Sequence, residues 1–534
     1  MKFLPIGFTI LYMKKVLLTV LALSAIIFSS CGKKTSGQGI SRKFDPRSGV
    51  YYTLFVRSFA DSNGDGIGDF NGIVTKLDYL ENLGITGIML LPVYKSHSYH
   101  GYDVDDYYEV NPEYGSLEDF ARLCDECRRR SIAVILDIPL NNSSKRNKWF
   151  IDSIDPKSPK RSWYRWTSAN DPEIGLKGFA YGHRVWNEMG GDYYSGLFSE
   201  ELPDFNHDNH EVREEFKKVL EFWLLMGASG FCFDSANHLY DAVKIPFSVR
   251  DGQERAIQFW SEMTSFVLSK CPGAYIVGEV WDTDNVRAEY MRGLPSTFHF
   301  DLGPKIISTI KTADSSNNAI GISEMNSNRM ASEKNPDFID APFLTNHDQN
   351  RPAQQFKNDP DLIKLAASMY LFVPGIPFVY YGEELGMNGN KPDEQIHSPF
   401  VWSRFFSSCQ TKWMESVYNE KTVPADRQDV DSNSILNYYR RAISFRVQNK
   451  SAFKGALFPE KTQNQAIVSW IIVGKGPERI WCFFNVSQEE QVIERPDKAL
   501  DANILFSQKN GASLTKDTLR IPSKSAVVFG VLAQ

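Results

Sequence analysis

Eight short runs rich in β-branched and aromatic residues recur along the chain, and amphipathic stretches separate most of them. The runs cover residues 50–56, 87–92, 132–138, 230–234, 274–280, 297–302, 342–346 and 377–382. Strands that alternate with helices indicate parallel βα units. Because eight such units fit a closed barrel, we expect an α/β protein with a (β/α)8 TIM barrel at its centre.

Two segments depart from this alternation. Between the third and fourth runs lies a stretch rich in Trp, Tyr, Gly and Asn, which is too long for a simple loop and is typical of an inserted subdomain. Near the end of the chain, strands alternate without helices, which predicts a C-terminal antiparallel β-sandwich domain. The expected boundaries are residues 46–138 and 206–454 for the barrel, 139–205 for the insertion (domain B) and 455–534 for the C-terminal domain.

The N-terminal segment has the composition of an export signal. Lys14 and Lys15 precede an apolar run over residues 16–28, and small residues then lead to Cys31. This order predicts a secretory signal peptide over residues 1–31 and a polar linker over 32–45. Small residues before a cysteine resemble a bacterial lipobox. We therefore expect an exported lipoprotein, anchored to a membrane of a bacterial cell envelope by a lipid on Cys31, in the periplasm or at the cell surface. A simply cleaved signal is the alternative.

Charge and cysteine content exclude several other functions. The formal net charge of −6 gives no reason to expect a nucleic-acid partner. The cysteines after Cys31 are scattered and do not suggest a disulfide framework. Cys124 and Cys127 lie in a segment with helical periodicity, which favours a helix over redox chemistry. We expect a monomer.

Polar side chains follow the predicted strands. In a barrel of this kind the C-terminal ends of the strands meet on one face, which carries the functional groups. The polar residues at these ends are Asp137, Asn141, Asp234, His238, Glu279, Asn346, His347 and Asp348. A lone aspartate at a strand end is more often a cap or turn residue. Three carboxylates from three strands, each beside a histidine or tryptophan, instead indicate a catalytic cleft.

Seven short motifs resemble, in the same order, those of the α-amylase superfamily of glycoside hydrolases. They are YHGYDVDDYY (99–108), ILDIPLNN (135–142), LPDFN (202–206), GFCFDSANH (230–238), VGEVW (277–281), FLTNHDQNR (343–351) and GIPFVYYGEELGM (375–387). The resemblance extends from about residue 46 to the end of the chain. It implies a (β/α)8 barrel, a domain B after the third strand and a C-terminal β-domain, in agreement with the strand pattern.

The resemblance also implies roles for individual residues. A retaining glycosidase needs a carboxylate nucleophile and a carboxylic acid roughly 5–5.5 Å apart. Asp234 matches the nucleophile and Glu279 the acid/base, while Asp348 would hold the sugar 2- and 3-hydroxyls. Trp281 is a candidate for the wall of the next subsite. The implied substrate-binding residues are His100, Tyr102, Asp103, Asn142, His238, His347 and Arg351.

The stretch DSNGDGIGD (61–69) follows the first strand and carries oxygen-bearing side chains at alternate positions around glycines. Hard, oxygen-seeking cations suit this pattern. Asp61, Asn63, Asp65 and Asp69 would supply side-chain oxygens, and Ile67 its backbone carbonyl. An acidic turn without metal is the alternative. Because members of the superfamily carry a calcium-binding loop of this pattern, we expect a structural Ca²⁺.

Two positions depart from the superfamily pattern. Asn142 stands where a histidine is usual, and an asparagine cannot become cationic. Cys232 stands where an arginine is usual, two residues before Asp234. Without that cation, repulsion from Asp348 and Glu279 should raise the pKa of Asp234. A reactive thiol is the alternative role for Cys232, although a buried strand cysteine is usually inert.

We therefore expect a retaining glycosidase of the α-amylase type that acts on α-linked glucans or gluco-oligosaccharides, or a transglycosylase where a sugar replaces water as the acceptor. The retained carboxylates favour an active enzyme. Cys232 and Asn142 favour an alternative, a weakened or inactive glycan-binding lipoprotein of the same fold. A structural scaffold is a third interpretation, and the intact Tyr102, His347 and Asp348 argue against it because a scaffold needs no complete sugar subsite.

Overall fold

The computed structural model describes residues 44–170, 179–180, 182–240, 249–315, 318–404, 408–474, 476–496 and 502–532. The predicted signal peptide, the lipobox-like end with Cys31 and most of the linker lie outside the described residues. Within the described part of the chain, no helix combines the length and apolar character needed to cross a membrane.

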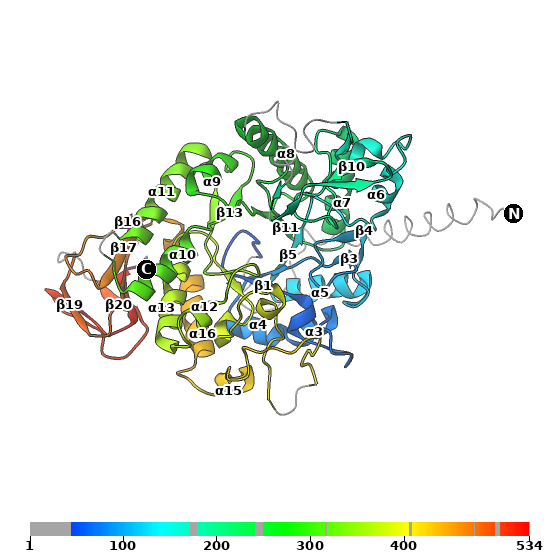
Figure 1. The fold of residues 1–534 in the computed structure, drawn as a ribbon. Coiled ribbons are helices and arrows are strands. Elements are labelled where there is room, and N and C mark those ends of the chain that lie inside the picture. Colours follow the sequence, from blue (N-terminus) through cyan, green and yellow to red (C-terminus); the bar gives the residue numbers. More distant parts are fainter. Residues whose placement is uncertain are drawn as a thin grey trace, which may run out of the picture. The chain divides into compact units, whose positions relative to one another are not determined.

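One parallel sheet of eight strands forms the centre of the described chain (Figure 1). Its strands, in spatial order, are β14 (Ile339–Ala341), β13 (Ser296–Phe298), β12 (Tyr275–Gly278), β11 (Gly230–Phe233), β5 (Ala133–Ile138), β2 (Gly87–Leu90), β1 (Tyr51–Leu54) and β15 (Phe378–Tyr380). A parallel bridge between Phe343 and Phe378 joins the two ends of this order. The predicted barrel is confirmed.

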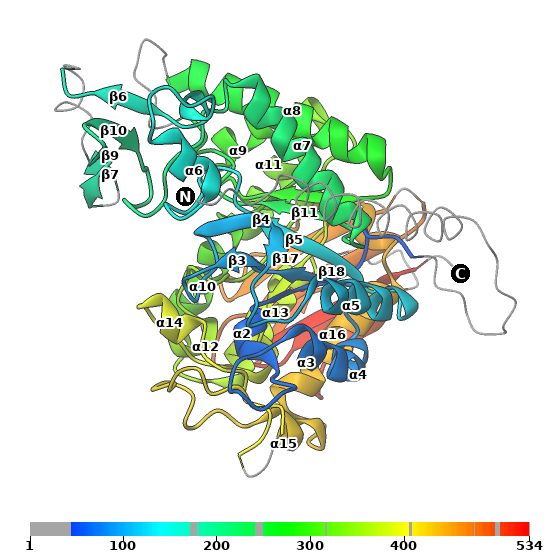
Figure 2. The ribbon, with the colours of Figure 1, turned by 90° about the vertical axis from the view of Figure 1, so that its right-hand side faces the viewer.

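Helices cover the outside of the barrel (Figure 2). The elements on and around it are α2 (Val56–Phe59), α3 (Phe70–Thr75), α4 (Leu77–Leu83), the hairpin β3 (Tyr94–Ser96) and β4 (Val104–Val110), α5 (Leu117–Arg129), α7 (His210–Leu225), α8 (Val249–Lys270), α9 (Asp284–Tyr290), α10 (Leu302–Thr312), α11 (Ala319–Lys334), α12 (Pro352–Gln355), α13 (Pro360–Leu371), η2 (Glu383–Leu385), α14 (Asp393–Ile396), α15 (Ala425–Asp429) and α16 (Ile435–Gln448).

Helix α5 shows why these segments are helical. It begins at a capping box in which Ser116 and Asp119 satisfy each other's backbone N–H groups. Its buried residues are Phe120, Leu123, Cys124 and Cys127, which is the spacing of one helical face. The C-x-x-C pair is therefore part of the face that packs on the barrel, as the periodicity predicts.

The seventh strand lies elsewhere than predicted. We expected it at residues 342–346, but β14 covers Ile339–Ala341. Pro342 has no N–H to donate to a ladder. After it, Phe343 is buried and contributes only the isolated bridge to Phe378.

Two antiparallel regions complete the fold. Between β5 and β11 lie α6 (Lys148–Ser153), η1 (Arg161–Trp163), the sheet of β6 (Trp166–Ser168), β10 (Asp192–Ser195) and β9 (Trp186–Met189), and the pair β7 (Phe179–Ala180) and β8 (His183–Arg184). After η3 (Ala452–Lys454), two sheets form from β16 (Ala456–Pro459), β17 (Ile467–Val473), β18 (Arg479–Asn485), β23 (Ser525–Val531) and β20 (Asn503–Ser507), and from β19 (Gln491–Glu494), β22 (Thr518–Ile521) and β21 (Ser513–Leu514). These last sheets are the predicted C-terminal β-domain.

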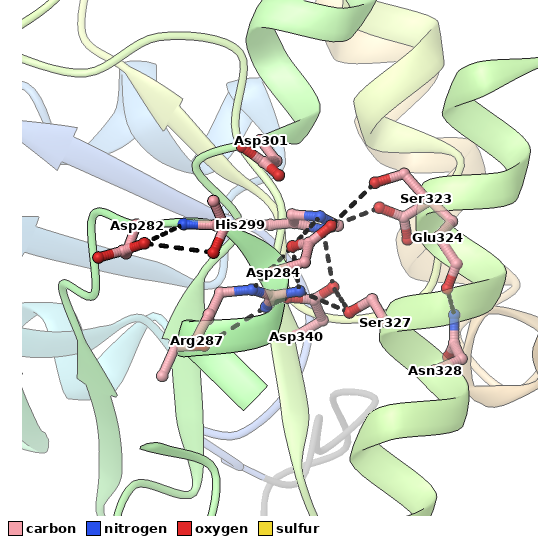
Figure 3. Close-up of polar contacts among 12 residues, drawn as sticks. Asp282, Asp284, Arg287, His299, Asp301, Ser323, Glu324, Ser327, Asn328 and Asp340 are labelled. Carbon is pink, nitrogen blue, oxygen red and sulfur yellow. Dashed lines mark hydrogen bonds and ion pairs between the residues drawn. The ribbon is translucent and has the colours of Figure 1, made fainter. Parts of the chain in front are cut away.

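A buried group of charges, called the His299 network below, lies between the barrel wall and helices α9 and α11 (Figure 3). His299 is 0% exposed. Its Nε2 is 3.2 Å from Asp284 Oδ1, and its Nδ1 is 2.9 Å from Glu324 Oε1 and 3.0 Å from Asp340 Oδ2. Arg287, also 0% exposed, is paired with Asp284 at 3.2 Å and Asp340 at 2.9 Å.

The charges around His299 favour its protonated form. Burial and Arg287 alone would lower the pKa of His299, but Asp340, Glu324 and Asp284 outweigh them and raise it well above its usual range. Carboxylates lie at both ring nitrogens of His299. The network therefore adds charge interactions to the packing of β13 and β14 with α9 and α11.

Candidate active site

Three carboxylates reach the C-terminal face of the barrel from three different strands. Asp234 follows β11, Glu279 follows β12, and Asp348 lies in the loop after β14. Glu279 N donates to Phe233 O at 2.9 Å, which ties the ends of β11 and β12 together. Asp234 and Glu279 are 9% and 6% exposed, whereas the Asp348 side chain is 38% exposed. The face thus offers two nearly buried carboxyl groups and one that meets solvent.

Tyr102 and His347 form one wall of this site. Their rings stack with centroids 5.7 Å apart and an interplanar angle of 8°. The Tyr102 hydroxyl donates to Asp137 Oδ2 at 2.7 Å and is 2.7 Å from His347 Nε2. Because a hydroxyl has one proton, the tyrosine oxygen accepts from His347 Nε2–H when it donates to Asp137. A hydrogen-bond relay therefore runs from His347 through Tyr102 to Asp137.

Asp137 is a strand-end carboxylate to which the sequence assigned no role. It is 0% exposed, and the register of β5 and β11 pairs it with Cys232. Burial raises the pKa of Asp137 to about 7, although hydrogen bonds from Tyr102 and Cys232 oppose the rise. Burial likewise raises the pKa of the Cys232 thiol well above its usual range. Cys232 is therefore a protonated thiol and not a nucleophile.

Asp234 and Glu279, the predicted catalytic carboxyls, also have raised pKa values. Burial, and next the charge of Asp137, raises the pKa of Asp234 to about 7. The same two causes, in the same order, raise the pKa of Glu279 well above its usual range. Within the described residues, no lysine or arginine nitrogen lies within 4.0 Å of these carboxylates, and His347 Nε2 is 3.5 Å from Asp348 Oδ2. The expected rise for Asp234 is present, but its largest charged cause is Asp137.

In the loop over residues 61–69, backbone N–H groups donate hydrogen bonds to the loop's own aspartate side chains. Asp61 accepts hydrogen bonds from the N–H groups of Asn63, Gly64 and Gly66 at 3.0, 2.7 and 2.8 Å. Asp65 Oδ1 accepts from Ile67 N at 2.8 Å. Carboxylate oxygens keep further lone pairs in such turns, so the donor set still fits a hard cation.

Asp69 has a second task, because its Oδ1 accepts from Gly72 N at 2.7 Å and caps α3. In the described part of the chain, Asp61, Asp65 and Asp69 form no ion pair with lysine or arginine. Within the described residues, the acidic and histidine ligand atoms that gather within 4.8 Å of one another belong to His299, Glu324 and Asp340. The carboxylates of Asp61, Asp65 and Asp69 do not form such a group.

The family model "Alpha amylase, catalytic domain" matches residues 53–455. The chain belongs to the α-amylase family. It is 40% identical to α-amylase 3 of Dictyoglomus thermophilum over 491 residues, which cover 91% of this chain and 93% of that protein. It is 31% identical to the 4-α-glucanotransferase of Thermotoga maritima, over 83% of this chain and 97% of that protein. The crystal structure of an α-amylase from H. orenii superposes with a TM-score of 0.82 and 34% identity, and the match covers 91% of this chain and 100% of that one.

Membership in the α-amylase family makes this chain a glycosidase-type enzyme. Position 232 is the main chemical departure from the motifs that resemble the superfamily. Where that resemblance implies an arginine among the carboxylates, this chain has a buried thiol next to Asp137. The site therefore carries the carboxylates of an α-amylase-family enzyme without their usual counter-ion.

Several predicted substrate-binding residues lie beside Tyr102. His100 is half-buried and stacks on Tyr102 at 6.0 Å, and burial lowers the pKa of its imidazole. Asp103 is 3% exposed. Asn142 is 2% exposed, and its Nδ2 donates to the Tyr102 carbonyl at 3.5 Å. Asn142 thus supports the loop that carries Tyr102, without reaching the open part of the cleft.

The other two predicted residues lie apart from Tyr102. His238 is partly exposed, and its ring meets Phe198 edge-on at 5.7 Å. Arg351 is 0% exposed, donates to the carbonyls of Ile396 and Tyr381 at 2.9 and 2.7 Å, and lies over an aromatic ring. The structure therefore does not support a direct sugar contact by Arg351. Its contacts hold two loops of this face together.

Two aromatic pairs flank the carboxylates. Trp281, the predicted subsite wall, is 48% exposed and stacks on Phe300 at 4.8 Å with an interplanar angle of 14°. Trp413 stacks on Tyr99 at 5.4 Å, and the sequence did not single out this pair. Its only signal was an aromatic residue in a long loop after the last barrel strand. Trp281 is the exposed ring of its pair, whereas Trp413 and Tyr99 are half-buried; a stacked aromatic ring with a free face suits the apolar face of a sugar.

Proposed function

We propose that this α-amylase-family enzyme is a retaining glycoside hydrolase that acts on α-linked glucans or gluco-oligosaccharides. The observation that carries the proposal is the convergence of Asp234, Glu279 and Asp348 from three strands beside the wall of Tyr102 and His347. Asp234 would attack the anomeric carbon while Glu279 protonates the leaving oxygen. Glu279 would then take a proton from the water that releases the sugar. Asp348 would hold the sugar hydroxyls.

The raised pKa values fit these roles unequally. A high pKa keeps Glu279 protonated, as a general acid requires. Asp234 must be ionised to attack, and a pKa of about 7 makes it a nucleophile mainly above neutral pH. We therefore expect kcat/KM to fall as the pH drops below about 7. The same property supports the alternative, a glycan-binding protein with weakened or no turnover.

Time-resolved product analysis tests the proposal. Starch, maltooligosaccharides and isomaltooligosaccharides are incubated with the enzyme at pH 8, and proton NMR follows the anomeric signals. The expected result is release of products that first appear as the α-anomer, with linkage identified by the substrate consumed. Products longer than the substrate would assign transglycosylation. Absence of turnover on all three, with oligosaccharide binding retained in calorimetry, would refute the hydrolase and support the binding protein.

We further propose that the loop over residues 61–69 binds a structural Ca²⁺ through Asp61, Asn63, Asp65, Asp69 and the Ile67 carbonyl. The support is a set of oxygen donors that includes three carboxylates and has no basic partner within the described residues. A bound ion would neutralise the carboxylate charges that gather before the start of α3. It has no part in bond cleavage.

Calcium removal is expected to destabilise the protein without changing the chemistry of the site. Millimolar EDTA should lower Tm by several degrees, because a bound ion stabilises the native state in proportion to RT ln(1 + [L]/Kd). Excess Ca²⁺ should restore it. The Asp65→Asn variant should lose this response, whereas Asp45→Asn, an aspartate before β1, should keep it. An equal Tm in EDTA and in calcium for the wild type would contradict the site.

Export and anchoring are also proposals. The basic, apolar and small residues that end at Cys31 support a signal peptide and a lipid anchor in a bacterial cell envelope. The element order supports the domain division at residues 139–205 and 455–534. A monomer remains our expectation.

A further inference from the structure

The site holds four carboxyl groups and lacks the arginine that would offset them. Asp137 is the charged group with the largest effect on both catalytic carboxyls, since it follows only burial among the causes of the raised pKa of Asp234 and of Glu279. An ionised Asp137 would therefore oppose ionisation of the nucleophile. The chemistry of the site depends on how Asp137 is kept from carrying a charge.

Among the described residues, no lysine or arginine forms an ion pair with Asp137. Titratable groups face it from every element packed around it, namely Tyr94 on β3, Tyr102 in the loop between β3 and β4, Cys232 and Asp234 on and after β11, Glu279 after β12, and His347 with Asp348 after β14. Of these, the tyrosines and the thiol are neutral, and three are acids. His347 reaches Asp137 only through the Tyr102 hydroxyl.

The two oxygens of Asp137 differ. Oδ2 accepts the hydrogen bond of the Tyr102 hydroxyl at 2.7 Å. Oδ1 is buried and accepts no hydrogen bond of ordinary geometry within the described residues, and the Cys232 thiol beside the carboxyl is only a weak donor. A buried carboxylate oxygen without a donor is costly when charged. Protonation of Oδ1 removes that cost and leaves the bond from Tyr102 intact.

We propose that Asp137 is a positioning residue that replaces the missing arginine by staying protonated at Oδ1. Neutral Asp137 allows Asp234 to ionise beside it, so the two carboxyls share one proton, and the pair keeps that proton on Asp137 when the nucleophile is active. Tyr102 holds the neutral carboxyl in place, and the small Cys232 thiol leaves room for it. This inference rests on the proposed role of Asp234.

The Asp137→Asn variant tests the proposal, because an amide has the shape and neutrality of a protonated carboxyl. Because a protonated Asp137 already carries no charge, the acid limb of the pH profile of kcat/KM is expected to stay in place and kcat/KM to be retained; a limb that moves about one unit lower would mean that Asp137 is ionised in the wild type and would overturn the proposal. Cys232→Ala, which removes the thiol but changes no charge, should also leave the limb in place. An equal loss of kcat/KM at every pH without a shift of the limb would assign Asp137 a merely structural role and overturn the proposal.

A second measurement does not need turnover. Carboxyls with raised pKa values bind protons in the folded state that they release on unfolding, so their contribution to stability is largest at low pH and is lost as the pH rises through about 7. Asp137→Asn should flatten this loss between pH 5 and 8 in urea unfolding, and comparison with the wild type cancels contributions from His299. Parallel profiles would overturn the proposal. If the wild type shows no turnover but Asp137→Asn still flattens the pH dependence of stability, only the proposed hydrolase activity is rejected.

In a Cys232→Arg background, the Asp137→Asn change is expected to have a different effect. With an arginine present, Asp137 becomes its ion-pair partner and should be ionised. Asp137→Asn would then leave a buried unpaired cation and lower kcat/KM at pH 6, where in the Cys232 enzyme the same change should leave it nearly unchanged. A loss confined to the Cys232→Arg background is expected, and an equal effect in both backgrounds would contradict the proposal.

Discussion

The Asp234→Asn variant is expected to lose about 10³-fold or more in kcat on maltooligosaccharides, because an amide cannot form the glycosyl-enzyme. Glu279→Gln should lose about 10²–10⁴-fold, the range of general acid catalysis. The two losses should differ with the leaving group. α-Glucosyl fluoride needs no acid, so it should restore much of the first step in Glu279→Gln and none of it in Asp234→Asn. Stopped-flow release of fluoride measures both.

Asp301→Asn is the matched control for these variants. Asp301 also follows a barrel strand, β13, but its side chain is 39% exposed and lies 3.4 Å from Lys305, away from the coupled carboxyls. Its kcat should remain within about twofold of the wild type, as for a surface position. If Asp234→Asn kept activity comparable to this control, Asp234 would not be the nucleophile.

The second large effect concerns stability. Replacing Arg287 by methionine should reduce the unfolding free energy of the barrel by about 3–5 kcal/mol, since it leaves Asp284 and Asp340 as buried charges that have lost a partner. Arg287 is 0% exposed and bonds to both carboxylates and to Ser327. Urea unfolding monitored by intrinsic fluorescence, with refolding verified, gives the difference.

Arg292 provides the comparison, because it lies just beyond the same helix in an exposed ion pair with Glu254 at 2.7 Å. Arg292→Met should cost at most about 1 kcal/mol, as is usual for surface pairs. Equal effects of the two variants would mean that the His299 network contributes no more than a surface pair. Methionine has a length similar to that of arginine. If Arg287 contributed mainly through the packing of its side-chain stem, Arg287→Met would therefore cost little stability.

The sequence predicted the parts of the molecule that depend on local pattern. Alternating runs predicted the barrel, and strand ends predicted the face on which Asp234, Glu279 and Asp348 meet. The departure at Cys232 was visible because the rest of its motif resembles the superfamily pattern, which usually has an arginine at this position. What the pattern could not supply was the register of β5 against β11, which places Asp137 beside Cys232. Asp137 is also the titratable group with the largest effect on the pKa of Asp234.

Side chains that point away from the barrel axis were harder to predict. Asp284, Arg287, His299, Glu324 and Asp340 come from two helices and two strands, and no spacing in the sequence marks them as one network. Arg351 was assigned to the sugar by its motif, yet its guanidinium is buried and donates to the carbonyls of Ile396 and Tyr381 inside the fold. In both cases the outcome depends on how helices and loops pack on the strands, which local pattern does not determine.

The strand ladder of the barrel is uneven around its circumference. β2 and β5 share four register pairs, whereas β12 and β13 share one, and β14 meets β15 only near the bridge from Phe343 to Phe378. Regions with few backbone hydrogen bonds open at lower free energy than the rest of a fold. Asp348 lies on the segment that follows β14, at the seam between β14 and β15. Local opening of the barrel would therefore be expected to begin at this seam, beside the segment that carries Asp348.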